Sequence, residues 1–86
     1  MIKTFDLNKT QLEKAKRLLN GEVVDGCSVE EVSEEMLEVW ISDLSGSKDS
    51  DDVERAKWYR QMIDEGAELY TFKDGWQDIG EIAVTD

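Results

Sequence analysis

The chain has 86 residues, of which 40% are apolar, and a formal net charge of −11, with no histidine, no proline and one cysteine. This length fits a single domain spanning residues 1–86. The absence of histidine removes the commonest general base and the commonest metal ligand. The negative charge would repel nucleic acid phosphates and an anionic membrane surface. Composition therefore argues against direct nucleic-acid binding, membrane binding and histidine-dependent catalysis.

The first two predicted elements are a short strand within residues 1–7 and a helix at about 9–20. Apolar residues alternate in the opening MIKTFDL segment. Thr10 and Glu13 have the spacing of a capping box, in which each side chain satisfies a free backbone N–H of the first turn. Gly21 suits the left-handed position that follows a helix. Apolar residues at helical spacing support this helix: Leu12, Ala15, Leu18 and Leu19.

A second helix is predicted at about residues 29–44. Ser28 and Glu31 repeat the capping-box spacing, and acidic residues in a first turn suit the positive end of the helix dipole. The apolar stripe of this helix is predicted to comprise Val29, Val32, Met36, Val39 or Trp40, and Leu44.

A third helix is predicted at about residues 51–65, after a polar loop at 45–50. Asp49 or Ser50 is the expected N-cap, and Gly66 is expected to end the helix. One apolar stripe comprises Val53, Ala56, Tyr59 and Ile63, and a second comprises Trp58 and Met62.

The last segment changes to a period of two residues, which predicts a β-hairpin turning at Asp74-Gly75. In that register Lys73 lies opposite Trp76 and Tyr70 lies opposite Ile79. Tyr70, Phe72 and Ile79 then share the face directed toward the helices. The predicted fold class is α+β, with three helices on one face of a small antiparallel sheet. The sheet consists of the hairpin, and the N-terminal strand is the candidate third strand.

Tests for catalytic and metal chemistry are negative. The phosphate-binding and dinucleotide-binding glycine motifs are both missing. A calcium loop starting at Asp49 would need Gly at its sixth position and Glu at its twelfth, but these positions hold Glu54 and Arg60. Cys27 is alone, so it can form neither an intramolecular disulfide nor a C-x-x-C motif. We expect a non-enzymatic, cytoplasmic protein without a cofactor or metal.

Between Glu22 and Glu54 the chain has twelve acidic residues and a single basic residue, Lys48. Like charges one helical turn apart destabilise a helix, so their retention suggests a basic partner. The competing interpretation is an ordinary solvated helix face. The candidate partner-binding residues are Glu30, Glu31, Glu34, Glu35, Glu38, Asp43, Asp49, Asp51, Asp52 and Glu54, with Trp58 and Trp76 as candidate aromatic anchors.

The predicted function is inhibition of a DNA- or RNA-binding host protein by occupying its basic surface in place of nucleic acid. Small, very acidic proteins of this kind are typical of phages and mobile elements. The alternative is an antitoxin, immunity-type inhibitor or adaptor that binds one protein mainly through its aromatic residues. Trp40 is predicted to lie in the core. A homodimer is a further possibility, because the first helix carries basic residues that could pair with the acidic face of a second copy: Lys9, Lys14, Lys16 and Arg17.

Overall fold

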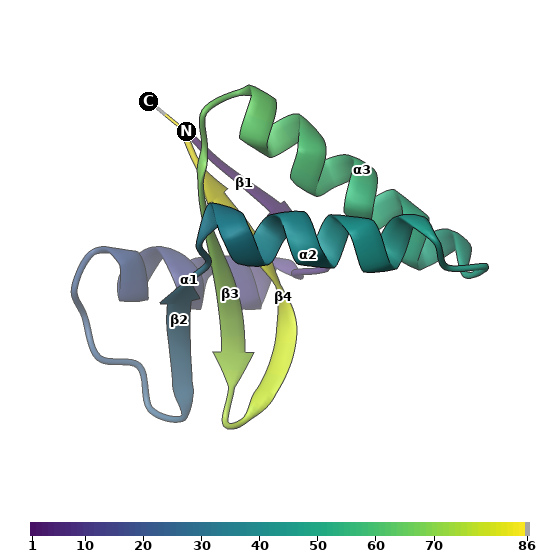
Figure 1. Ribbon diagram of the computed structural model, residues 1–86. Coiled ribbons are helices and arrows are strands. Elements are labelled where there is room, and N and C mark those ends of the chain that lie inside the picture. Colours follow the sequence, from purple (N-terminus) through teal and green to yellow (C-terminus); the bar gives the residue numbers. More distant parts are fainter. Residues whose placement is uncertain (86) are drawn as a thin grey trace.

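The computed structural model describes residues 1–85 and shows an α+β fold, as predicted (Figure 1). Strands and helices follow in the order β1 (Ile2–Phe5), α1 (Lys9–Leu19), β2 (Cys27–Glu31), α2 (Glu34–Ser45), α3 (Ser50–Asp64), β3 (Glu68–Asp74) and β4 (Gln77–Val84). The four strands form one antiparallel sheet in the order β1-β4-β3-β2. The N-terminal strand and the C-terminal hairpin are both confirmed.

The prediction that all three helices cover one face of the sheet is wrong. Side chains alternate between the two faces of a strand. Phe72 and Ile82 pack with Ala15 of α1 on one face, whereas Leu69 and Ala83 pack with α2 and α3 on the other. In Figure 1, α1 lies behind the sheet, and α2 and α3 lie in front of it. The molecule therefore has three layers and two separate hydrophobic clusters.

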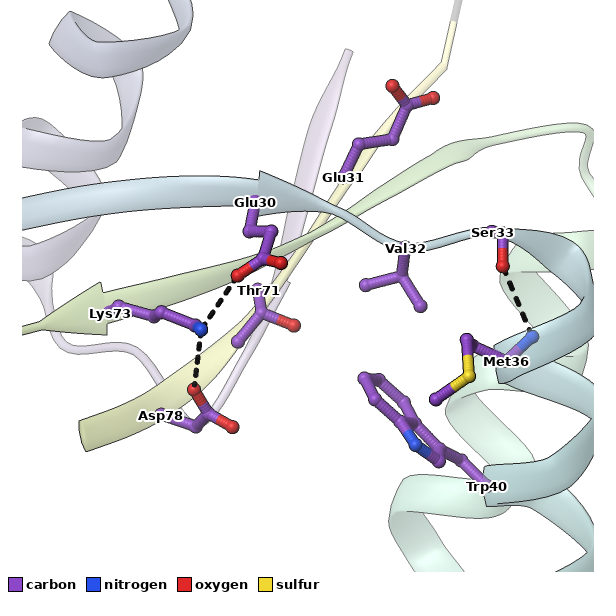
Figure 2. Close-up of a pocket in the computed structure, with 9 residues that line it drawn as sticks. All are labelled: Glu30, Glu31, Val32, Ser33, Met36, Trp40, Thr71, Lys73 and Asp78. Carbon is purple, nitrogen blue, oxygen red and sulfur yellow. Dashed lines mark hydrogen bonds and ion pairs between the residues drawn. The ribbon is translucent and has the colours of Figure 1, made fainter. Parts of the chain in front are cut away.

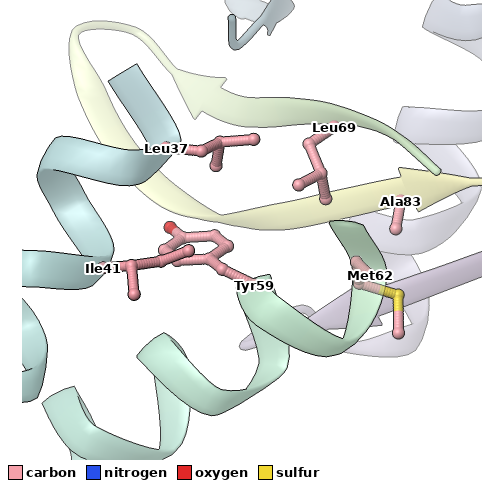
Figure 3. Close-up of a cluster of buried hydrophobic side chains, with 6 residues drawn as sticks. All are labelled: Leu37, Ile41, Tyr59, Met62, Leu69 and Ala83. Atoms are coloured by element: carbon pink, nitrogen blue, oxygen red, sulfur yellow. The ribbon is translucent and has the colours of Figure 1, made fainter. Parts of the chain in front are cut away.

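The cluster in front of the sheet joins α2 and α3 to β3 and β4 (Figure 3). Met36 and Val39, which the predicted stripe placed in the core, are 47% and 53% exposed. The stripe that α2 buries is one position out of phase with the predicted one, because the helix begins later than predicted. The buried members of the cluster are Leu37, Ile41, Tyr59, Met62, Leu69 and Ala83.

The predicted start of the second helix is wrong, because residues Cys27–Glu31 form strand β2. The N-cap is Ser33, whose Oγ accepts a hydrogen bond from the Met36 N–H at 3.3 Å. Val29 packs into the cluster on the α1 face and lies opposite Phe72 of β3. Pairing with β3 satisfies backbone groups on that side of the segment, so the strand replaces the first predicted turn of helix.

The other predicted helices are nearly correct in extent, but the cap of α1 differs from the prediction. Asn8, rather than Thr10, is the N-cap, and Asn8 and Gln11 exchange hydrogen bonds of 2.8 and 2.9 Å. Of the two N-caps predicted for α3, Asp49 is the one observed, and its side chain accepts from the Asp51 N–H at 2.9 Å.

The predicted hairpin register is also wrong. Asp74 lies opposite Gln77, so the two turn residues are Gly75 and Trp76. Gly75 has φ of 65°, which suits the first central position of a type II′ turn. Tyr70 lies opposite Ile82, with Ile79 as an extra residue in β4 where the register shifts. Ile79 still joins Tyr70 and Phe72 in the cluster on the α1 face, so their shared face is confirmed.

Candidate functional site

The acidic residues lie on three different elements. Glu30 and Glu31 are on β2, next to each other and therefore on opposite faces of the sheet. Glu30 faces α2 and forms a 2.7 Å ion pair with Lys73, whereas Glu31 lies beside Tyr70 on the other face. The predicted helical row of Glu30, Glu34 and Glu38 is therefore wrong, since Glu30 does not belong to α2.

Helix α2 carries an acidic side without compensating charge. Glu34 and Glu38 lie one turn apart, Glu35 lies next to them, and all three side chains are exposed. Within residues 1–85, none of these three carboxylates forms an ion pair. Glu34 and Glu35 occupy the first turn, where the helix dipole stabilises negative charge. Within residues 1–85, no basic side chain therefore neutralises this side of α2.

The remaining acidic residues gather where α2 ends and α3 begins. Asp49 caps α3, and Asp52 accepts a hydrogen bond of 2.8 Å from the Ser47 hydroxyl, so both contribute to the fold of the connection. The Glu54 carboxylate lies 3.8 Å from the Lys57 ammonium, both well exposed. The structure thus brings together an acidic tip formed by Asp43, Asp49, Asp51, Asp52 and Glu54.

A groove lies beside α2, between this helix and the part of the sheet that the helix leaves uncovered. Its first hollow, of about 280 Å³, lies between Met36 and Trp40 of α2 and the sheet residues Lys73 and Asp78. Figure 2 shows the side chains of Met36 and Trp40 reaching from α2 into this opening, opposite Lys73 and Asp78. A second hollow of about 270 Å³ also has Trp40 and Asp78 in its walls, so the two hollows adjoin at these residues, and we call them together the groove. The second hollow is lined by Trp40, Asp43, Leu44, Arg55, Tyr59, Asp78 and Glu81.

Two ion networks set the charge of the groove. Lys73 lies 2.7 Å from Glu30 and 3.8 Å from Asp78, and the hydrogen bond that its ammonium donates to Glu30 raises the pKa of Lys73. Arg55 binds Glu81 at 3.1 Å, and burial raises the pKa of Glu81 although Arg55 opposes the shift. Asp43 forms no ion pair with any residue of the described chain. The groove therefore keeps an excess of negative charge.

The three tryptophans occupy different environments. Trp58 is half-buried, with its ring centroid 5.7 Å from that of Phe5 and 5.9 Å from that of Tyr59, so it is a packing residue more than a free anchor. Trp76 is 97% exposed on the hairpin turn. Trp40 packs 6.0 Å from the Tyr59 ring, which agrees with its predicted place against the core, and also lines the groove.

The sequence interpretation did not identify the groove. Met36, Val39, Trp40 and Asp43 follow the i, i+3, i+4, i+7 spacing of one helix side, and on this side Met36 and Val39 are exposed while Trp40 is half-buried. This spacing could have indicated the groove from the sequence, because α2 has apolar residues on this side in addition to Leu37 and Ile41, which form its core stripe. Its partners on the sheet, Lys73 and Asp78, could be identified only from the strand register.

No group of three or more cysteine, aspartate or glutamate side chains within residues 1–85 is arranged to hold a metal ion. No helix among these residues has the length and apolar character needed to cross a bilayer. No protein-family model, curated protein or solved structure matches the chain.

Proposed function

We propose that this protein binds, without catalysis, to the basic surface of a DNA- or RNA-binding protein in the cytoplasm and blocks that surface. The observation that carries the proposal is the unpaired charge of Glu34, Glu35 and Glu38 on α2. Such a surface attracts a strongly basic partner over a distance set by the ionic strength. Nucleic-acid-binding proteins have the most strongly basic surfaces, which is why this class of target is preferred.

The geometry of α2 supports mimicry of a phosphate backbone. Carboxylates one helical turn apart repeat about every 6 Å at a rise of about 1.5 Å per residue. One DNA strand presents phosphates about every 3.4 Å along the axis, so the spacing of Glu34 and Glu38 roughly matches that of a phosphate and the second phosphate after it. The acidic tip continues the charge past the end of α2. A phage or mobile-element protein that disables a host factor would use such a surface.

A second candidate function is supported by the exposed apolar residues. Trp76 is 97% exposed, and Met36 and Val39 are about half exposed. Exposed aromatic and methionine side chains are common anchors of protein interfaces. An antitoxin, immunity-type inhibitor or adaptor would bind through these residues, and its complex would depend little on salt.

Self-association through charge is limited by the arrangement of the layers. The basic helix α1 and the acidic helix α2 lie on opposite faces of the sheet. A contact between α1 of one copy and α2 of another would be head-to-tail. It would leave α2 of the first copy and α1 of the second free to bind further copies. Charge pairing of these helices thus favours an open, salt-sensitive assembly over a closed homodimer.

The test is retention of proteins from a bacterial lysate on the immobilised chain, with elution by a salt gradient. We expect a DNA- or RNA-binding protein that is released at moderate salt and displaced by added DNA. The triple variant Glu34→Gln, Glu35→Gln and Glu38→Gln should lose this partner. The matched control Glu13→Gln, Asp25→Asn and Asp64→Asn makes the same change in net charge on other surfaces and should retain it. Retention of the partner by the α2 variant would contradict the proposal.

A further inference from the structure

The groove beside α2 combines an aromatic wall with carboxylates, which suits the binding of a cationic side chain. We infer that its second hollow accepts an arginine side chain from the basic partner, between the Trp40 ring, which Tyr59 supports from the core, and the carboxylates of Asp43 and Asp78. The inference depends on the proposed function only in taking the partner to be basic. It adds a defined contact to an interface otherwise described by charge alone.

The aromatic wall is the first argument. The Trp40 and Tyr59 ring centroids lie 6.0 Å apart, and Tyr59 is only 2% exposed, so its position is fixed by the core. Trp40 is half-buried and lines both hollows. A guanidinium is planar and weakly hydrated, and it stacks on aromatic faces better than an ammonium does. Trp40, backed by the buried Tyr59 ring, thus offers the hollow an aromatic surface that favours arginine over lysine.

The charge balance is the second argument. Asp43, Asp78 and Glu81 line the second hollow, and Arg55 is the only cationic residue in its wall. The charge of Arg55 is already matched, since its two terminal nitrogens bind Glu81 and Asp6 at 3.1 and 2.5 Å. Asp43 therefore remains for an incoming cation, and Asp78, which Lys73 approaches only to 3.8 Å at Oδ1, keeps its other oxygen as an acceptor. A carboxylate and a guanidinium can form two parallel hydrogen bonds, which adds geometric selectivity.

The position of Asp43 is the third argument. Asp43 lies in the last turn of α2, which contains no basic residue. Negative charge near a helix C-terminus is destabilising, because the helix dipole places partial negative charge there. Within residues 1–85, Asp43 has neither an ion pair nor a side-chain hydrogen bond that would offset this cost. An external guanidinium would supply the missing partner.

The size of the hollow agrees with a single side chain. Its volume of about 270 Å³ is near the lower limit of sites for drug-sized ligands, and it is open to the surface. A second copy of the chain is a poor occupant, because both copies carry a strong negative charge. An arginine on a basic partner enters with favourable charge, and its aliphatic stem can lie along Leu44.

The inference can be tested without knowing the partner. The probes are three capped pentapeptides with a single central arginine, lysine or citrulline between glycines, and the readout is the NMR shift of the tryptophan indole N–H signals. We expect the arginine peptide to shift the Trp40 signal saturably and the citrulline peptide to leave it unchanged. Equal affinity for the lysine peptide, or a shift confined to Trp58 or Trp76, would overturn the inference.

Variants separate this site from the acidic side of α2. Asp43→Asn with Asp78→Asn should weaken arginine-peptide binding about tenfold or more, the loss typical of a charge-assisted hydrogen bond. Glu34→Gln with Glu35→Gln makes the same change in net charge and should alter affinity less than about twofold. Asp43→Asn alone, which removes no internal contact, guards against a folding defect in the double variant. Equal losses in the two double variants would overturn the inference.

The two proposals fail in different ways. If the arginine peptide binds at Trp40 but the α2 triple variant retains the lysate partner, the proposed function fails and the groove site stands. If the triple variant loses the partner but the arginine peptide does not reach Trp40, the groove site fails and the proposed function stands.

Discussion

Arg55 Nη1 lies 3.1 Å from Oε1 of Glu81, a residue with only 3% of its surface exposed. The second carboxylate oxygen accepts a hydrogen bond of 3.2 Å from the Thr71 hydroxyl, and Arg55 also binds Asp6 at 2.5 Å. This network connects α3 to β4, to β3 and to the turn after β1. Breaking a buried pair by removing one partner is costly, because it leaves an uncompensated charge.

The first prediction concerns the pH dependence of Glu81. Burial raises its pKa in the folded protein, so the folded state holds this proton more tightly than the unfolded state does. Glu81 then contributes most to stability below the ordinary glutamate range, and that contribution is lost as the pH rises through the raised value. Glu81→Gln mimics the protonated form. Loss of the ion pair to Arg55 costs stability at every pH, but the stability of the variant relative to the natural protein should rise as the pH increases above the ordinary glutamate range, measured by urea unfolding.

Glu30 provides a control of opposite sign. Its hydrogen bond to Lys73 lowers the pKa of Glu30 in the folded protein, so its contribution is present above the ordinary glutamate range and is lost as the pH falls. Glu30→Gln should therefore lose stability relative to the natural protein over the same rise in pH. If both variants changed in the same direction, the assignment of the Glu81 effect to burial would be wrong.

The second prediction concerns Gly80 in β4. A Cβ atom at this position would overlap the carbonyl oxygen of Phe5 and lie 2.8 Å from Cδ2 of Leu7. Both contacts belong to the segment that leads from β1 into α1, so relief of the clash requires the backbone to move. Gly80→Ala should lower the free energy of unfolding by about 1–3 kcal/mol, as overpacking of a core typically does. Ala at Gly46, which meets nothing closer than 3.8 Å, is the control.

The extents of α1, α3 and the hairpin were predictable because their signals are local. Asp49 and the glycine that follows each of these helices mark ends that hardly depend on the rest of the chain. Strand β2 was not predictable, because Ser28 and Glu31 imitate a capping box and the deciding contacts come from β3, about forty residues later. The positions of Met36 and Val39 followed from the same error, since the predicted phase of α2 depended on its predicted start.

The candidate site was predictable in composition but not in arrangement. The sequence identified the excess of acidic residues, because charge can be counted along a chain. The separation of Glu30 from Glu31 by the sheet, and the neutralisation of Glu30 by Lys73, depend on strand pairing. The groove likewise requires Met36 and Trp40 of α2 to lie across an opening from Lys73 and Asp78 of the sheet. These are non-local features that no spacing within one helix reveals.

The third prediction tests which serine starts α2. The Ser33 hydroxyl accepts from the Met36 N–H, whereas Ser28 is an exposed residue of β2. Ser33→Ala should lower the free energy of unfolding by about 0.5–2 kcal/mol, the usual effect of losing an N-cap. Ser28→Ala should change it by less than about 0.5 kcal/mol, as most surface substitutions do. A larger loss at Ser28 than at Ser33 in chemical unfolding would show that the helix begins where the capping-box pattern suggested.

The last prediction concerns Trp76, which distinguishes the two candidate functions. Its side chain is 97% exposed at the hairpin turn, where the positive φ of Gly75 supplies the required backbone conformation. Trp76→Ala therefore removes almost no buried contact, and we expect the free energy of unfolding to change by less than about 0.5 kcal/mol. Because the proposed function depends on charge, this variant should also retain the lysate partner, and the salt concentration that releases the partner should be unchanged.

The aromatic alternative predicts a different result from the same variant. An exposed tryptophan that anchors an interface typically contributes about 2 kcal/mol or more to binding, so its removal would release the partner at every salt concentration. Trp58→Phe is not a suitable control, since Trp58 packs against Phe5 and Tyr59 and its loss would disturb the fold. Val23→Ala is suitable, because Val23 is 85% exposed and lies outside the groove. If Trp76→Ala lost the partner and Val23→Ala did not, the partner would bind mainly at the hairpin turn, and the proposal that it binds the carboxylates of α2 would be wrong.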